Sequence, residues 1–217
     1  SQDMQIHFSQ ASAYNRQFVD TFPNHPLNAK RLFLLAESEF KIHNWLSAIL
    51  AYEQVGYDYP DFPEASEAAY AAIVTYTEFS KTWNSLAPEE KQEWLRAEQA
   101  NRLRFVAGHP SDKRALDVLF VALSYEFNNK DYELALANAD RLIDWSVSFQ
   151  NAPKASQFQL RESYLIKAHS LYALNRFQEA EKAYGVALAY LDTNDKRRLA
   201  LIENLPASVY KQAAGSH

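Results

Sequence analysis

The chain has 217 residues, 47% of them hydrophobic and 23% charged, which is typical of a globular protein with enough apolar material for a sizeable core. A net charge of -5 argues against a nucleic acid or an anionic membrane as the partner, because both favour clustered Lys and Arg. The absence of cysteine excludes disulfides, a thiolate nucleophile and a zinc site with cysteine ligands.

The first predicted element is a helix from about residue 4 to residue 22, with apolar residues at helical intervals. It ends before Pro23, because proline lacks the N–H that the next helical turn needs. When Pro23 is aligned with Pro60, this helix matches the second helix of the segment that follows. We therefore expect residues 1–26 to contain the second helix of an incomplete repeat.

Residues 27–62 form the clearest predicted repeat, a helix, a tight turn and a second helix that ends at Pro60. A pair of helices this short cannot bury its apolar side alone, so it requires neighbours of the same kind. The apolar residues recur at helical spacing in both halves: Leu32, Leu35, Ala36 and Phe40, then Trp45, Ala48, Tyr52 and Val55.

Further repeats follow along the chain. The next one is longer and has an insertion at its turn, where Pro88 followed by Glu89 and Glu90 signals the start of a helix. The expected segments are a longer, degenerate repeat (63–110), a repeat with a loop (111–157), a last repeat (158–193), a C-terminal capping helix (194–213) and a stretch that resembles a tag remnant (214–217).

The first and last complete repeats share a pattern of small and aromatic residues. The aligned pairs are Ala36 with Ala168, Trp45 with Phe177, Ala48 with Ala180 and Tyr52 with Tyr184. This pattern resembles the tetratricopeptide repeat (TPR) family, in which small residues lie where two helices touch and aromatic residues fill the gaps between them. The resemblance implies an all-α fold, specifically a right-handed TPR-like superhelix, or solenoid.

The turns between the repeats carry a second resemblance. Each turn begins with an aromatic residue followed by proline, at Pro23, Pro60 and Pro110, with Pro or Ala at set spacing after it. Such turns are similar to those of TPR lipoproteins in the bacterial outer-membrane protein assembly machinery and of the periplasmic TPR protein of the Tol-Pal system. This implies a role as a protein-binding scaffold in a bacterial envelope complex and a periplasmic location, with the cytoplasm as the alternative. No apolar run approaches the ~20 residues that cross a bilayer, so we expect no direct membrane insertion.

Residues with catalytic chemistry are present but are not grouped. The six histidines are scattered, and none has the spacing that places two imidazoles on one helix face. The acids Glu37 and Glu39 are expected on solvated helix faces, since residues two apart on a helix point in different directions. No glycine-rich phosphate loop occurs. We therefore expect no enzymatic activity, no cofactor and no metal site.

The TPR resemblance implies that the first helices of the repeats line a concave groove for a protein or peptide partner. Aromatic or large apolar residues recur at the groove positions of three repeats, and we expect them to form a ladder for a peptide segment. The expected groove residues are Phe33, Glu37, Phe40, Lys41, Phe120, Phe127, Leu165, His169 and Tyr172.

Alternatives stay open for both the site and the function. The family usually has its aromatic residue one position before Phe40 and Tyr172, where this chain has Glu39 and Leu171. An equally good interpretation therefore gives Phe40 and Tyr172 a place in the core. Two alternative functions remain for the whole chain. One is an oligomerisation or assembly module of a larger protein, forming a homo-oligomer. The other is an accessory subunit of an enzyme or of a polysaccharide-export machine.

Overall fold

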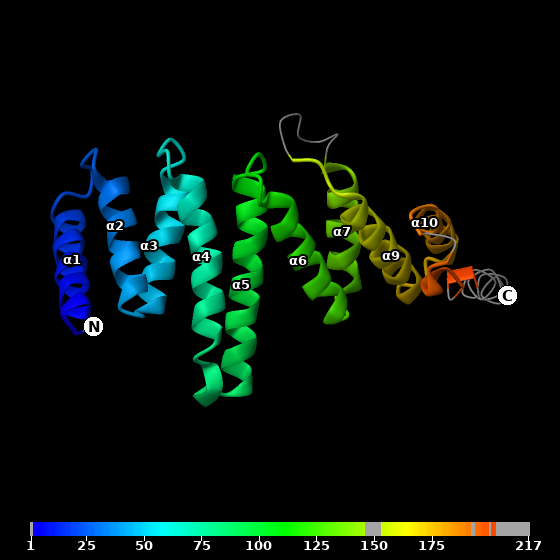
Figure 1. Cartoon of the computed structure of the whole chain (residues 1–217), viewed down its shortest axis with the longest axis horizontal. Coiled ribbons are helices and arrows are strands. Elements are labelled where there is room, and N and C mark those ends of the chain that lie inside the picture. Colours follow the sequence, from blue (N-terminus) through cyan, green and yellow to red (C-terminus); the bar gives the residue numbers. More distant parts are fainter. Residues whose placement is uncertain (1, 146–152, 192–193, 200, 203–217) are drawn as a thin grey trace. The chain divides into compact units, whose positions relative to one another are not determined.

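The computed structural model describes residues 2–145, 153–191, 194–199 and 201–202. Every regular element in these ranges is a helix (Figure 1), so the expected all-α class is confirmed for this part of the chain. None of the described helices combines the length and the apolarity that a membrane crossing requires. The chain divides into two compact units, unit 1 (Ser1–His109) and unit 2 (Pro110–His217), which are described separately.

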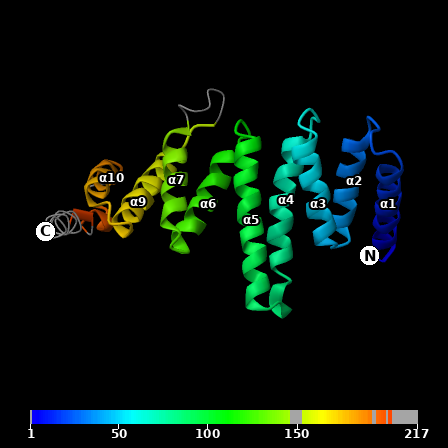
Figure 2. The same ribbon diagram turned by 180° about the vertical axis from the view of Figure 1, so that it is seen from behind.

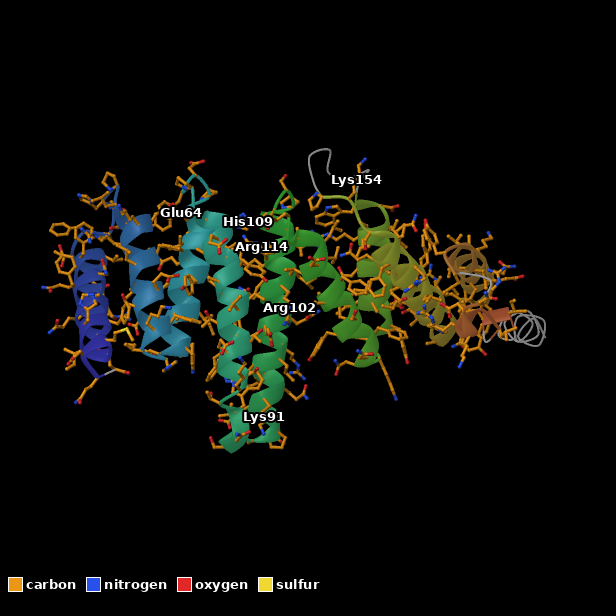
Figure 3. The ribbon with its side chains drawn as sticks, in the orientation of Figure 1. Glu64, Lys91, Arg102, His109, Arg114 and Lys154 are labelled. Atoms are coloured by element: carbon orange, nitrogen blue, oxygen red, sulfur yellow. The ribbon has the colours of Figure 1, made fainter. Side chains whose placement is uncertain are left out.

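In unit 1, each described α-helix packs on the next one along the chain (Figures 1 and 2). The elements are α1 (Gln2–Thr21), α2 (Asn28–Lys41), α3 (Trp45–Asp58), α4 (Ala65–Ser80), the short 3₁₀-helix η1 (Trp83–Ser85) and α5 (Pro88–Gly108). The pair α4–α5 extends beyond α2 and α3, and Figure 3 shows Lys91 near its far tip and Arg102 about midway along α5. Helix α5 begins at Pro88, where the Glu90 carboxylate accepts the N–H of Ala87 at 2.9 Å.

Unit 2 is built in the same way. Its described helices are α6 (Ala115–Asn128), α7 (Tyr132–Ile143), α9 (Gln157–Ala173) and α10 (Phe177–Ala189). The expected loop after residue 145 lies partly outside the described residues, as does most of the expected capping helix, of which residues 196–199 and 201–202 are helical. The tag-like residues 214–217 lie entirely outside the described ranges.

The same turn joins α2 to α3, α6 to α7 and α9 to α10. One residue in each turn has the left-handed backbone conformation, with φ of 63° at His43, 63° at Lys130 and 61° at Asn175. The N–H of the following residue then donates to a carbonyl five residues back: Asn44 to Glu39 at 2.9 Å, Asp131 to Glu126 at 2.9 Å and Arg176 to Leu171 at 2.8 Å. Such bonds satisfy carbonyl groups that a helix end leaves free. The three helix pairs are therefore closed by one shared backbone geometry.

Buried alanine residues are part of the cores of both units. Four alanines of the aligned pattern have no exposed surface: Ala36, Ala48, Ala168 and Ala180. Because their side chains are small, neighbouring helix backbones approach closely. The rings of Tyr52 in unit 1 and Tyr184 in unit 2 are buried beside them and fill the remaining space.

The structure corrects the expectation that Glu39 lies on a solvated face, because Glu39 is only 2% exposed. Its carboxylate accepts hydrogen bonds from Ser12 Oγ (2.6 Å) and Arg16 Nη2 (2.6 Å) of α1, and from Asn44 Nδ2 (2.7 Å) in the turn after α2. Burial by itself would raise the pKa of Glu39, but these hydrogen bonds together lower it below the ordinary value. A buried charge is tolerated when it is paired and hydrogen-bonded in this way. Glu39 therefore connects α1 to α2.

Candidate functional site

In unit 1, the expected groove residues Phe33, Glu37 and Phe40 lie on one side of α2 and are half-buried. The ring of Phe33 lies 6.1 Å from the ring of Tyr52 and 6.2 Å from that of Phe62, measured between centroids. Phe33 thus contacts the core, and the smaller part of its surface remains accessible. This side of α2 is called the α2 face below.

The carboxylate of Glu37 is oriented by the core. The hydroxyl of Tyr52 donates to Glu37 Oε1 at 2.5 Å. Burial, and then the Glu37 carboxylate, raise the pKa of Tyr52 far above its ordinary value, so the tyrosine remains a neutral donor. The carboxylate is therefore held in place on the α2 face by the hydroxyl of Tyr52.

The aromatic residue at the end of each first helix packs edge-on against an aromatic residue of the second helix. The ring pairs are Phe40 with Trp45 (5.4 Å, 75°), Phe127 with Tyr132 (6.0 Å, 64°) and Tyr172 with Phe177 (5.3 Å, 69°). Phe40 packs against the core of unit 1 and Tyr172 against that of unit 2, and both stay half-buried. These side chains therefore contribute to packing while keeping one accessible side, and a role for them in binding a partner stays a prediction.

In unit 2, the expected residue Phe120 lies beside an aromatic residue that the sequence analysis missed. The ring of Phe158 at the start of α9 is 5.6 Å from that of Phe120, and Phe158 is 54% exposed. The guanidinium of Arg161 lies over the Phe158 ring at 5.2 Å from the centroid. The signal for this helix start was available, because Ser156 and Gln159 form a capping box in which each side chain bonds the other's backbone N–H.

His169 connects three helices of unit 2. Its ring lies 6.1 Å from Phe127 of α6, and its Nδ1 is 2.8 Å from the hydroxyl of Tyr184 on α10. Burial lowers the pKa of His169, so the imidazole is neutral at pH 7. Burial, and then Tyr172, raise the pKa of Tyr184 to about 12, so this hydroxyl keeps its proton. The pair is therefore an uncharged hydrogen bond beside Phe127 of α6.

Two expected groove residues have other surroundings. Leu165 is buried in the core of unit 2, which leaves little of its surface for a partner. Lys41 is exposed and lines a shallow depression with Met4 and Phe8 of α1 and His43 of the turn. The expected ladder includes residues of both units. In unit 1 the structure places Phe33, Glu37 and Phe40 on one side of α2, and in unit 2 it pairs Phe120 with Phe158 and Phe127 with His169.

Within the described ranges, no three His, Asp or Glu side chains are grouped so that they could hold a metal ion. The sequence matches no protein-family model, and no curated protein is significantly similar to it.

Proposed function

We propose that this protein is a non-enzymatic scaffold that binds a peptide segment of a partner protein through the accessible aromatic side chains of its first helices. On this proposal its helix pairs are TPR-like and stack as a right-handed superhelix. The surfaces involved are the α2 face in unit 1 and the pair Phe120 and Phe158 in unit 2. The junction turns favour a periplasmic site of action in a bacterial envelope complex.

The observation that carries the proposal is the exposure of Phe158 beside the half-buried Phe120. A large aromatic ring that is half in water contributes free energy when a partner covers it, roughly 1.5–3 kcal/mol for complete burial of such a side chain. Aromatic residues held by their neighbours are also typical of the few positions where binding energy is concentrated. The α2 face also offers a ring, that of Phe33, and on the same side of the helix a carboxylate, that of Glu37, which Tyr52 holds in place.

A displayed library of random peptides, selected on the purified chain, tests this proposal. We expect selected peptides to lose affinity about tenfold on Phe158→Ala or Phe33→Ala, because each substitution removes an anchor ring. Leu134→Ala is the matched control, since Leu134 is a comparably exposed apolar residue on α7, a second helix. Peptides whose affinity is indifferent to both phenylalanines, or falls equally with Leu134→Ala, would rule out these surfaces.

A second candidate function, an assembly module, is favoured by the exposed apolar residues of α1. Met4 is 58% exposed, Ile6 51% and Tyr14 57%. These side chains do not all lie on one side of α1, so another copy would cover only part of them, and in doing so would bury apolar surface that a monomer leaves in water. Light scattering over a wide range of protein concentration distinguishes the two functions. An assembly module requires a molar mass that rises with concentration, and Ile6→Gln should remove that rise. The peptide-binding scaffold does not require the mass to change with concentration.

A further inference from the structure

A hollow on unit 1 lies between α1 and α3, with α2 as its floor, and we call it the α1–α3 hollow. The buried residues Leu32 and Leu35 of α2 line it together with Ala51 of α3. Its volume is about 150 Å³. Helical spacing places Leu32 and Leu35 on a different side of α2 from Phe33 and Glu37, so the hollow is separate from the α2 face.

The size and lining of the hollow limit what it accepts. An apolar cavity of about 150 Å³ holds one molecule the size of benzene. The α1–α3 hollow has this volume but is open to solvent, and Ser47 and Gln54 line it beside the apolar residues. Its volume therefore fits one phenylalanine- or leucine-sized side chain that enters from the open side. Leu50, which also lines it, is 58% exposed, so a segment that inserted such a side chain would cover apolar surface at the opening as well.

The two charged residues that line the hollow differ in their partners. Arg16 Nη2 donates to Glu39 Oε1 at 2.6 Å and to Ser47 Oγ at 2.6 Å, so its charge is compensated from within unit 1. Asp20 is exposed and, across the residues that the structure describes, its side chain forms no hydrogen bond or ion pair. The opening thus presents one uncompensated negative charge, which favours a cation beside the apolar group.

We propose that the α1–α3 hollow binds a segment of a partner protein that inserts one Phe- or Leu-sized side chain and places a neighbouring Lys or Arg at Asp20. The small volume specifies a single apolar anchor, and the free carboxylate specifies the sign of the adjacent charge. The site uses none of the residues of the proposed peptide-binding surfaces. A negative result for the α1–α3 hollow therefore leaves the proposed peptide-binding surfaces untouched, and a negative result for those surfaces leaves the hollow untouched.

Three small probes with the same ring and spacer test the proposal: 2-phenylethylammonium, 2-phenylethanol and 3-phenylpropionate. Binding is followed by methyl NMR of Val19, Leu32, Leu35 and Leu50, which line the hollow. We expect saturable shifts at these methyl groups, with the cation binding about fivefold more tightly than the anion and the alcohol in between, as for one exposed ion pair.

Two substitutions and one control locate the effect. Asp20→Asn should remove the preference for the cation while the ring still binds, whereas Asp58→Asn, a carboxylate at the end of α3 that does not line the hollow, should preserve it. Ala51→Leu should fill the hollow and weaken all three probes, with thermal unfolding as the check that unit 1 is intact. Shifts that do not saturate, equal affinity for the cation and the anion, or the same change with Asp58→Asn as with Asp20→Asn would overturn the proposal.

Discussion

Gly56 of α3 lies directly against Ala69 of α4, so closely that a Cβ atom on Gly56 would be 2.7 Å from the Ala69 Cβ and 2.8 Å from the Ala69 backbone. Real Cβ atoms do not approach other atoms this closely, and backbone atoms cannot move aside as the end of a flexible side chain can. Both residues are buried. Glycine at this position therefore determines how closely α3 and α4 pack.

Gly56→Ala is expected to destabilise unit 1 by about 1–3 kcal/mol, because the added methyl group overpacks the contact with Ala69. The effect opposes intrinsic preference, since Ala is normally favoured over Gly inside a helix by roughly 0.5–1 kcal/mol. Gly185 on α10 is the matched control, because a Cβ atom there would meet nothing within 4 Å. In urea unfolding followed by circular dichroism, Gly185→Ala should therefore be stabilising. If the two substitutions had the same sign, the close approach of α3 and α4 would be refuted.

Glu39→Gln is expected to destabilise unit 1 by about 1–3 kcal/mol at pH 7, because hydrogen bonds to a charged, buried group are lost or weakened. The pKa of Glu39 is lowered in the folded state, so its contribution is complete above its ordinary value of 4.5 and is lost as the pH falls through the folded-state pKa. Unfolding free energies measured between pH 7 and pH 3 should thus converge for the wild type and the variant. Glu89→Gln, at the exposed start of α5, is the control. A gap between wild type and Glu39→Gln that stayed constant down to pH 3 would contradict this account.

The pair Phe40 and Trp45 is expected to show direct coupling. In a double-mutant cycle with Phe40→Ala and Trp45→Ala, the two losses of unfolding free energy should be non-additive by about 0.5–1.5 kcal/mol, the range for edge-to-face rings. The equivalent cycle for Tyr172 and Phe177 should give a similar value in unit 2. Additive losses would mean that the rings merely lie near each other, which would favour the partner-binding role of Phe40 over its role in packing.

Lys130→Gly is expected to stabilise unit 2 by about 1 kcal/mol, because Lys130 has a φ of 63°, a left-handed conformation that disfavours side chains with a Cβ atom. Asn175→Gly should gain less, since asparagine tolerates this conformation better than lysine. Thermal unfolding of both variants measures the difference. A loss of stability with Lys130→Gly would show that the lysine side chain contributes more to the turn than its backbone conformation costs.

The helical periodicity and the proline positions predicted the all-α class, because both act through neighbouring residues along the chain. Helix α5 begins at Pro88, where the sequence carried a helix-start signal, and α1 ends at Thr21, shortly before Pro23. Fully buried alanines such as Ala36 and Ala180 were identifiable from their recurrence at matched positions. Whether the helix pairs stack as a TPR superhelix, and what they bind, stay predictions.

The surroundings of Glu39 and Phe158 were decided by tertiary structure. The spacing of Glu39 to Glu37 predicted a solvated acid, since local spacing carries no information about α1. In the structure, Ser12 and Arg16 of α1 bond its carboxylate, although they lie 27 and 23 residues away in the chain. Phe158 became significant only because α9 brings its ring beside Phe120 of α6. The sequence by itself determined where helices form and which of their sides are apolar, since these depend on local spacing. Only the packing of helices determined which polar groups are buried and which rings stay accessible, since their partners come from distant segments.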